Sequence, residues 1–287
     1  MSDTTVYAAL VILFGLLVGS FLNVVIYRLP RMMELGWARE HAAYAAQQAG
    51  KELPDTDAEQ QFNLLTPPSR CRQCGHRVRW YENIPIISYL VILRGKCSSC
   101  KTPIGIRYPL VELVTAAVAW WCLHRYGMQW HALAWFFFGA CLICLTLIDW
   151  DTTYLPDSIT LPLLWAGLLL ATLGLTGISL SSAVWGAAVG YSSLWLIYWG
   201  FKLLTGKEGM GFGDFKLFAA LGAWFGITAL IPIILMAAVI GAIVGIAMKF
   251  GGQLREGGYI PFGPFLALGG AAVWIFGASE LMRMVGL

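Results

Sequence analysis

The chain has 287 residues, of which 58% are hydrophobic and only 12% are charged. A soluble domain of this size carries about twice that fraction of charge. The net charge is +3, and the basic residues form no clustered stripe of the kind that binds phosphate backbones. The composition therefore indicates a membrane protein whose partner is the lipid bilayer and excludes nucleic acid as a partner.

Several apolar runs approach the roughly 20 residues that a helix needs to cross about 30 Å of hydrocarbon. We therefore expect an all-α polytopic membrane protein with about eight transmembrane helices. In chain order the expected spans lie near residues 6–27, 108–124, 131–148, 159–176, 181–204, 215–229, 230–249 and 260–279. The sixth and seventh share one long apolar stretch, and Gly226 and Pro232 mark the expected break between them.

The distribution of basic residues predicts the orientation in the membrane. Twelve of the 19 Lys and Arg lie in residues 28–107, five more lie in the connections after the fifth and seventh spans, and two remain for the other side. Because Lys and Arg concentrate on the cytoplasmic side, the 28–107 loop is expected in the cytoplasm and both termini outside. This predicts three parts: a first transmembrane helix at 1–27, a cytoplasmic loop domain at 28–107 and a membrane core at 108–287.

The cytoplasmic loop contains two pairs of cysteines. An Ala-rich run at 35–53 comes first and favours a helix. Cys71 and Cys74 then form one C-x-x-C pair, and Cys97 and Cys100 form a second pair after 22 intervening residues. This spacing is typical of a zinc ribbon with four thiolate ligands. The alternative, a pair of disulfides, conflicts with the reducing cytosol.

The other cysteines and the nearby histidine have simpler interpretations. His76 follows the first pair, but four thiolates already complete a tetrahedral site, so we expect it to be a bystander. Cys122, Cys141 and Cys144 lie inside expected spans and are interpreted as small buried apolar residues.

Two aspartates stand at the cytoplasmic ends of expected spans. Asp149 directly follows the third span, which is expected to end at Ile148, and Asp214 opens the sixth span within GMGFGDFK. An Asp at the centre of a membrane helix costs about 2.5–3.5 kcal/mol on insertion scales, so such residues are usually functional. Two nearby carboxylates cannot easily both ionise and share a proton. One can then take a proton from water while the other donates to a carbonyl oxygen, which predicts aspartyl peptide hydrolysis.

The glycines before Asp214 fit this chemistry. Gly211 and Gly213 lack Cβ atoms, so a substrate backbone could approach Asp214 closely, and unusual φ angles are allowed there. We interpret them as substrate-approach residues.

Structural explanations compete with this interpretation. Asp214 could cap the sixth span, and Asp149 could pair with a lysine such as Lys216. Asp157 is interpreted as the N-cap of the fourth span, and the role of Asp151 is open. In a different class of function, the chain would be a transporter or channel with a zinc-stabilised cytoplasmic domain, and Asp149 and Asp214 would relay protons or bind a cation.

The motifs together resemble the bacterial type IV prepilin peptidases, which are GxGD intramembrane aspartyl proteases. The resemblance covers nearly the whole chain. It rests on the two C-x-x-C pairs and on GSFLNVVIYRLP at 19–30, ENIPIISYL at 82–90, RYPLVEL at 107–113, LIDWD at 147–151, GKEGMGFGDFKL at 206–217 and IPFGPFLALGG at 260–270.

The resemblance implies an enzyme of the bacterial inner membrane with Asp149 and Asp214 as its catalytic pair; the termini, expected outside from the basic residues, would then be periplasmic. Such enzymes cut the basic leader from prepilins and pseudopilins after a glycine at the cytoplasmic face. Many also N-methylate the new terminal residue with S-adenosylmethionine as methyl donor. In this family, methylation is associated with the segment that corresponds to the surroundings of Gly95 and Lys96.

Overall fold

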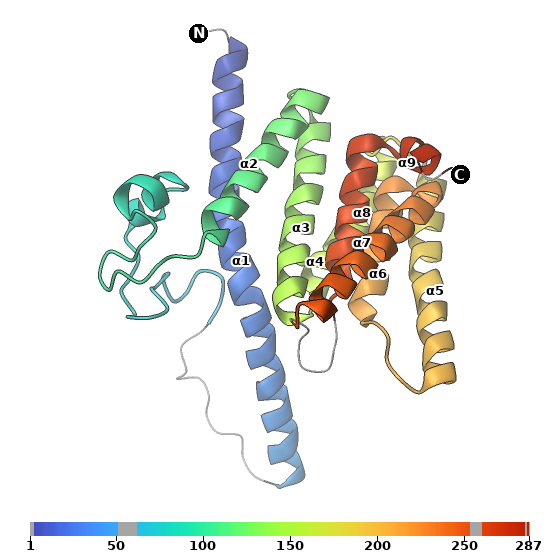
Figure 1. Ribbon diagram of the computed structural model, residues 1–287, viewed down its shortest axis with the longest axis horizontal. Coiled ribbons are helices and arrows are strands. Elements are labelled where there is room, and N and C mark those ends of the chain that lie inside the picture. Colours follow the sequence, from blue (N-terminus) through green and yellow to red (C-terminus); the bar gives the residue numbers. More distant parts are fainter. Residues whose placement is uncertain (1–2, 51–61, 253–259, 285, 287) are drawn as a thin grey trace. The chain divides into compact units, whose positions relative to one another are not determined.

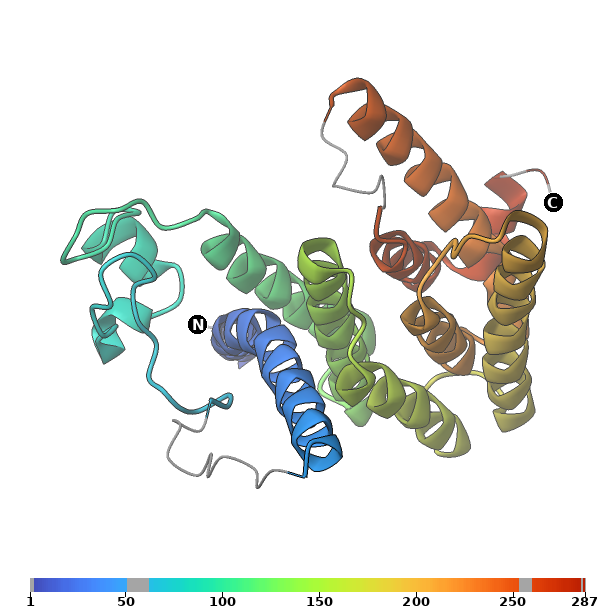
Figure 2. The same ribbon diagram turned by 90° about the horizontal axis from the view of Figure 1, so that it is seen from below.

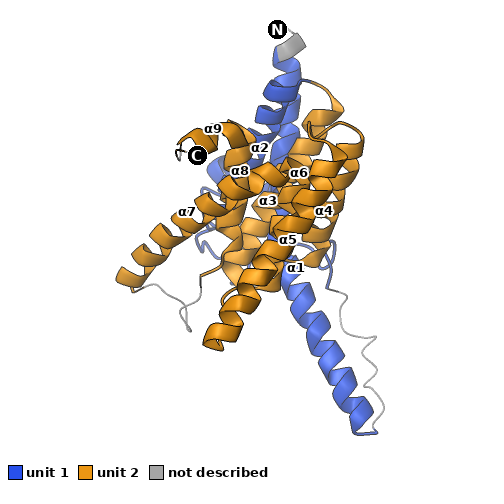
Figure 3. Ribbon diagram, turned by 90° about the vertical axis from the view of Figure 1, so that its right-hand side faces the viewer, with its two compact units in different colours: residues 1–127 blue, residues 128–287 orange. Residues whose placement is uncertain are grey.

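The computed structural model describes residues 3–50, 62–252, 260–284 and 286. Among these residues the chain is helical and has no regular strand; two isolated β-bridges pair Arg70 with Arg77 and Lys96 with Pro103. It divides into two compact units, residues 1–127 and 128–287 (Figure 3). The expected all-α class is confirmed.

The first unit contains two long helices and the cysteine-bearing loop. Its elements are α1 (Asp3–Gln48), the short helices η2 (Trp80–Asn83) and η3 (Ser88–Ile92), and α2 (Arg107–Tyr126). α1 runs without a break past the expected end of the first span at residue 27, because the Ala-rich run is helical as predicted as far as Gln48. Residues 51–53 of that run lie outside the described part of the chain.

Small residues bring α1 and α2 together. A Cβ atom on Gly15 would lie 2.6 Å from Ala116 Cα, and one on Gly19 would lie 2.6 Å from Glu112 Cα. Because real side chains do not tolerate such distances, only glycine allows the two backbones to approach this closely. Figure 1 shows the two helices side by side.

The second unit is a bundle built around α6. Its elements are α3 (Trp130–Thr152), α4 (Asp157–Thr172), α5 (Leu180–Thr205), α6 (Phe212–Phe225), η4 (Ile227–Ala229), α7 (Leu230–Phe250), α8 (Gly263–Phe276) and α9 (Ala278–Met284). α6 packs against α4, α5 and α8, and most of its side chains are buried. The break between α6 and α7 falls at Gly226, with a φ of 82°, as the sequence predicts.

Three kinds of contact fix the C-terminal part of α6 in place. The backbones of α5 and α6 touch where Gly186 faces Gly222. On another side, the Trp224 indole N–H donates to the Leu163 carbonyl of α4 at 2.8 Å. An aromatic cluster then joins α3, α6 and α8, with ring centroids of Trp135 and Trp224 5.1 Å apart. These contacts hold the C-terminal part of α6 against its neighbours.

Each of the eight expected spans overlaps a helix of the structure, although residues 173–176 lie beyond the end of α4 and residues 260–262 precede α8. Among the described residues, four helices are long and apolar enough to cross a membrane: Thr5–Gln48, Trp130–Thr152, Leu180–Thr205 and Ile227–Phe250. A fifth results if α8 and α9, which are bent by 104° at their junction, form one broken span. The third span was expected to end at Ile148, but α3 continues to Thr152 and Thr153 caps it with a φ of 60°. Asp149 therefore lies inside the last turn of the helix.

Candidate active site and thiolate cluster

Asp149 and Asp214 are both buried inside the second unit. Asp149 in the last turn of α3 is 3% exposed, and Asp214 in the first turn of α6 is 5% exposed. Burying a carboxylate to this degree is costly, and such residues are usually functional, so the structure is compatible with the predicted pair.

Leu155 connects the surroundings of the two aspartates. A Cβ atom on Gly263, the first residue of α8, would lie 2.5 Å from Asp149 Oδ2 and 3.0 Å from Leu155 Cδ1. A Cβ atom on Gly213 would lie 2.6 Å from Leu155 Cβ. One leucine thus packs against the glycine that borders Asp149 and against the glycine that precedes Asp214. The end of α3 and the beginnings of α6 and α8 converge on it.

The glycine motif acts through close packing and not through unusual backbone angles. The φ of Gly211 is −84°, and Gly209 and Gly213 are also absent from the positive-φ region. Gly211 and Gly213 therefore do not use the unusual φ angles that glycine allows. Gly213 is required by the neighbouring Leu155 side chain, while a Cβ on Gly211 would make only an ordinary contact with Asp214.

The capping of α6 by Asp214, which was the structural alternative to a catalytic role, is present. The Gly211 N–H donates to Asp214 Oδ2 at 3.1 Å. This bond holds the carboxyl group against the turn that carries the glycines and fixes its orientation at the helix N-terminus.

The other charged residues near the site differ from expectation. Lys216 does not bond Asp149; its Nζ donates to both oxygens of Asp157, at 2.6 and 2.7 Å. Asp157 is also not the N-cap of α4, because Pro156 occupies that position and Asp157 is the first helical residue. Residue preference favoured Asp157 as the N-cap, but its carboxylate is instead bound by Lys216 of α6, which lies 59 positions away in the sequence. Asp151 is exposed.

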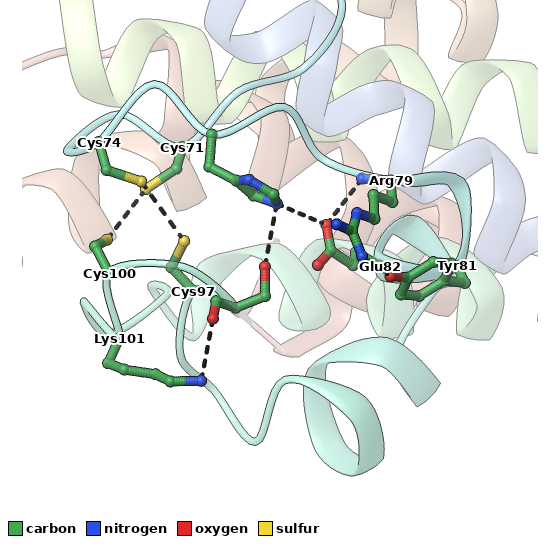
Figure 4. Close-up of polar contacts among 10 residues, drawn as sticks. Cys71, Cys74, Arg79, Tyr81, Glu82, Cys97, Cys100 and Lys101 are labelled. Carbon is green, nitrogen blue, oxygen red and sulfur yellow. Dashed lines mark hydrogen bonds and ion pairs between the residues drawn. The ribbon is translucent and has the colours of Figure 1, made fainter.

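The four cysteines of the two C-x-x-C pairs converge in the first unit, as the spacing predicted. We call residues 71–74 the first knuckle and residues 97–100 the second knuckle. Their Sγ atoms all lie within 4.8 Å of one another, and they form no disulfide. Cys71 Sγ lies 3.8 Å from Cys100 Sγ, and Cys74 Sγ lies 3.9 Å from Cys97 Sγ (Figure 4). Four sulfurs bound to one tetrahedral zinc at 2.3 Å would be about 3.8 Å apart. The donor set therefore fits zinc.

The pKa values of these thiols also favour binding of a cation. Hydrogen bonds to the side chain and backbone of Thr102 lower the pKa of Cys100 to about 6, so that it is ionised at neutral pH. The pKa of Cys74 rises to about 11: the His76 backbone lowers it, but burial and the three neighbouring thiols outweigh this. Four crowded thiols that cannot all ionise alone form an arrangement that a bound metal ion stabilises.

His76 lies outside the set of four converging sulfurs. Its Nε2 is 3.4 Å from Glu82 Oε2 and 3.2 Å from Ser98 Oγ, so it links the first knuckle to η2 and to the second knuckle (Figure 4). The Arg79 N–H also donates to Glu82 Oε2, at 2.8 Å. These hydrogen bonds connect and orient the segments that carry the cysteines, as partners around metal sites commonly do.

The remaining candidates are placed as follows. Cys122 and Cys144 are buried and Cys141 is half-buried, as their positions in apolar runs predicted. Gly95 has a φ of 70° and packs against Tyr89, and the Lys96 side chain is exposed. A role of Gly95 and Lys96 in methylation stays a prediction.

Sequence reasoning did not single out Gly263 or Leu155. Gly263 lies in IPFGPFLALGG, one of the stretches that carry the family resemblance, so a signal was present. Leu155 lies between Asp149 and Asp157 but has an unremarkable side chain, and only the packing of three helix ends identifies it.

Comparison with known proteins places the chain in a family. Residues 13–126 match the bacterial peptidase A24 N-terminal domain, and residues 136–246 match the type IV leader peptidase family. The first match covers most of the first compact unit, and the second lies within the second unit and ends in α7. The chain belongs to the type IV leader peptidase family.

Several named relatives match over nearly their full lengths. A prepilin leader peptidase/N-methyltransferase of Burkholderia pseudomallei (strain 1026b) is 50% identical over 99% of this chain and 90% of its own. Proteins of the same name from Pseudomonas aeruginosa and Neisseria gonorrhoeae are also 50% identical; the alignments cover 92% and 96% of this chain and 89% and 93% of theirs. No solved structure matches the chain.

Proposed function

We propose that the chain is a membrane-embedded aspartic endopeptidase that removes the basic leader of type IV prepilins and pseudopilins, and that it also N-methylates the new N-terminus. The names of its relatives favour this enzyme over a transporter or channel. The observation that carries the peptidase assignment is the burial of Asp149 and Asp214 in terminal turns of α3 and α6, where the adjacent Gly263 and Gly213 both pack on Leu155.

In the proposed reaction the two aspartates share one proton. The ionised member takes a proton from a water molecule, whose oxygen attacks the scissile carbonyl carbon. The protonated member donates its proton to the carbonyl oxygen, and the resulting tetrahedral intermediate collapses with proton transfer to the leaving amine. Of the two glycines interpreted as substrate-approach residues, Gly211 leaves room for the substrate backbone beside Asp214, whereas the Leu155 side chain fills the space beside Gly213. The glycine that precedes the scissile bond would help the substrate helix unwind.

The proposed topology places this site at the inner leaflet. In this proposed topology, the protein crosses the bacterial inner membrane eight times and both termini lie in the periplasm. The shorter helices α2, α4 and α6 then cross the membrane as the longer helices do. Its parts are the first transmembrane helix (1–27), the cytoplasmic loop domain (28–107) and the protease core (108–287). A substrate with a helix in the bilayer and a basic leader in the cytoplasm would present its cleavage point at this level.

The loop domain would hold one structural zinc through Cys71, Cys74, Cys97 and Cys100. The metal would supply folding energy to a segment that has no regular strand among its described residues. N-methylation would use S-adenosylmethionine, with the amine attacking the methyl carbon and S-adenosylhomocysteine leaving. The segment around Gly95 and Lys96 is the proposed region for this activity.

Cleavage of a purified prepilin in detergent tests the peptidase assignment. Asp149→Asn and Asp214→Asn should each lower kcat by at least about 10³-fold, because an amide can neither take nor give the proton at neutral pH. Asp151→Asn is the matched control, since this exposed carboxylate lies on the same helix; it should cleave at a near-normal rate. Normal cleavage by either of the first two variants would refute the catalytic pair.

A further inference from the structure

The loop domain exposes an unexpectedly apolar segment, residues 84–95. It contains η3, a single π-helical turn, and four of its large apolar side chains are more than 40% exposed: Ile87, Leu90, Val91 and Ile92. Leu90 and Val91 reach 63% and 67%. A cluster of this kind on a surface facing water would favour aggregation, so it indicates a surface with an apolar partner.

The position of this segment along α1 identifies the partner. The Ile86 N–H donates to Glu112 Oε2 at 2.8 Å, and Glu112 lies against Gly19, whose Cβ would be 2.6 Å from Glu112 Cα. Gly19 precedes Tyr27, the end of the apolar run of α1, by eight positions, which is about 12 Å along a helix. The segment therefore lies at the depth of the apolar part of a candidate membrane span. Figure 1 and Figure 2 show its teal coil beside the N-terminal part of α2.

The neighbouring part of the loop marks the edge of that apolar run. The Arg72 guanidinium lies 3.9 Å from the centre of the Tyr27 ring, and the Arg28 Nη1 donates to the Asn63 carbonyl at 2.9 Å. Residues 63–72 thus lie near the level at which α1 becomes polar. Between them and α2 the chain passes through the deeper 84–95 segment.

The backbone of the segment is suited to hydrocarbon, where an unpaired N–H costs several kcal/mol. Ser88, Leu90, Leu93 and Gly95 donate to carbonyls within the segment at 2.7–3.0 Å. Ile86 has a φ of 58°, a conformation that β-branched residues rarely adopt. The Glu112 carboxylate accepts its N–H and holds it there.

The ends of the segment carry groups that suit a lipid headgroup layer. Trp80 and Arg79 precede it, Arg94 lies in its last turn and Lys96 follows it; all four are exposed. Tryptophan favours the membrane interface, and basic side chains are attracted to anionic phospholipids. The charge pattern therefore matches an acidic lipid surface.

We propose that residues 84–95 form a lipid-facing re-entrant turn, which dips into the bilayer beside α1 and α2 and is held by Glu112. The assignment of this turn to the cytoplasmic leaflet rests on the proposed function. The turn would place the thiolate cluster against the membrane surface, where the leader of a membrane-bound substrate emerges.

Photolabelling of the full chain tests this placement without any substitution. The protein is reconstituted in phosphatidylethanolamine–phosphatidylglycerol vesicles that contain a phospholipid with a diazirine in its acyl chain. Adducts on residues 87–92 should be as frequent as on Leu113 of α2, an exposed neighbour of Glu112, while residues 38–44 of α1 should remain unlabelled. Labelled Leu113 with unlabelled 87–92 would overturn the proposal, including the cases in which a second copy or a prepilin covers the segment.

A matched pair of variants tests the role of Glu112. Glu112→Gln keeps an acceptor oxygen for the Ile86 N–H, whereas Glu112→Leu removes it. Amide exchange across 86–92 should be at least about tenfold faster in Glu112→Leu than in Glu112→Gln. Equal exchange in both would show that Glu112 does not hold the turn. Prepilin cleavage with the Asp149 variant is measured separately, so that failure of this placement is distinguishable from failure of the peptidase assignment.

Discussion

Gly263→Ala provides the sharpest test of the proposed active-site geometry. The added Cβ would lie 2.5 Å from Asp149 Oδ2 and 3.0 Å from Leu155 Cδ1. Carbon and oxygen atoms in contact are normally about 3.3 Å or more apart, so the carboxylate must move by about 1 Å. A misplacement of this size can lower the rate about 10²-fold, which corresponds to about 2.7 kcal/mol in the activation free energy.

The assay is steady-state cleavage of a purified prepilin by the enzyme in detergent. We expect kcat of Gly263→Ala to fall about 100-fold. Gly200→Ala is the matched control, because a Cβ on this α5 residue meets no atom within 4 Å; its kcat should not change. Methylation of an already cleaved pilin should also persist in both variants, which would show that the protein is folded.

A wild-type rate for Gly263→Ala would refute this reasoning if Asp149→Asn is inactive in the same assay. That combination would mean that Asp149 is essential but does not face α8 in the working enzyme. The proposed convergence of three helix ends on Leu155 would then be wrong.

Three further predictions follow from the packing and the charges. Gly213→Ala should impair cleavage by a clash with Leu155, and Leu155→Ala in the same chain should restore part of the activity; equal loss in the single and double variants would contradict the contact. Metal analysis should find about one zinc per chain in the wild type and in Cys122→Ser, but much less in Cys100→Ser, which should also lose methylation more than cleavage; paired disulfides in a metal-free wild type would overturn the zinc site. Lys216→Met removes a partly exposed ion pair with α4 and should cost at most about 1 kcal/mol of stability with cleavage retained; inactivation would indicate that this lysine serves the catalytic aspartates.

The sequence determined the features that depend on local patterns. Apolar runs predicted the helices, because a segment of the required length and hydrophobicity has few other options in a membrane. Two C-x-x-C knuckles predicted a thiolate cluster, since each knuckle already turns its two sulfurs to one side. The break at Gly226 followed from a residue that readily adopts positive φ.

Only the tertiary structure decided which distant groups meet. The sequence did not reveal that Lys216 binds Asp157, that Gly263 borders Asp149, or that Glu112 accepts the N–H of Ile86. These contacts join residues 26 to 114 positions apart and depend on the rotation and depth of packed helices. Helical period and propensity describe one segment at a time, so they leave open which face of one helix touches another.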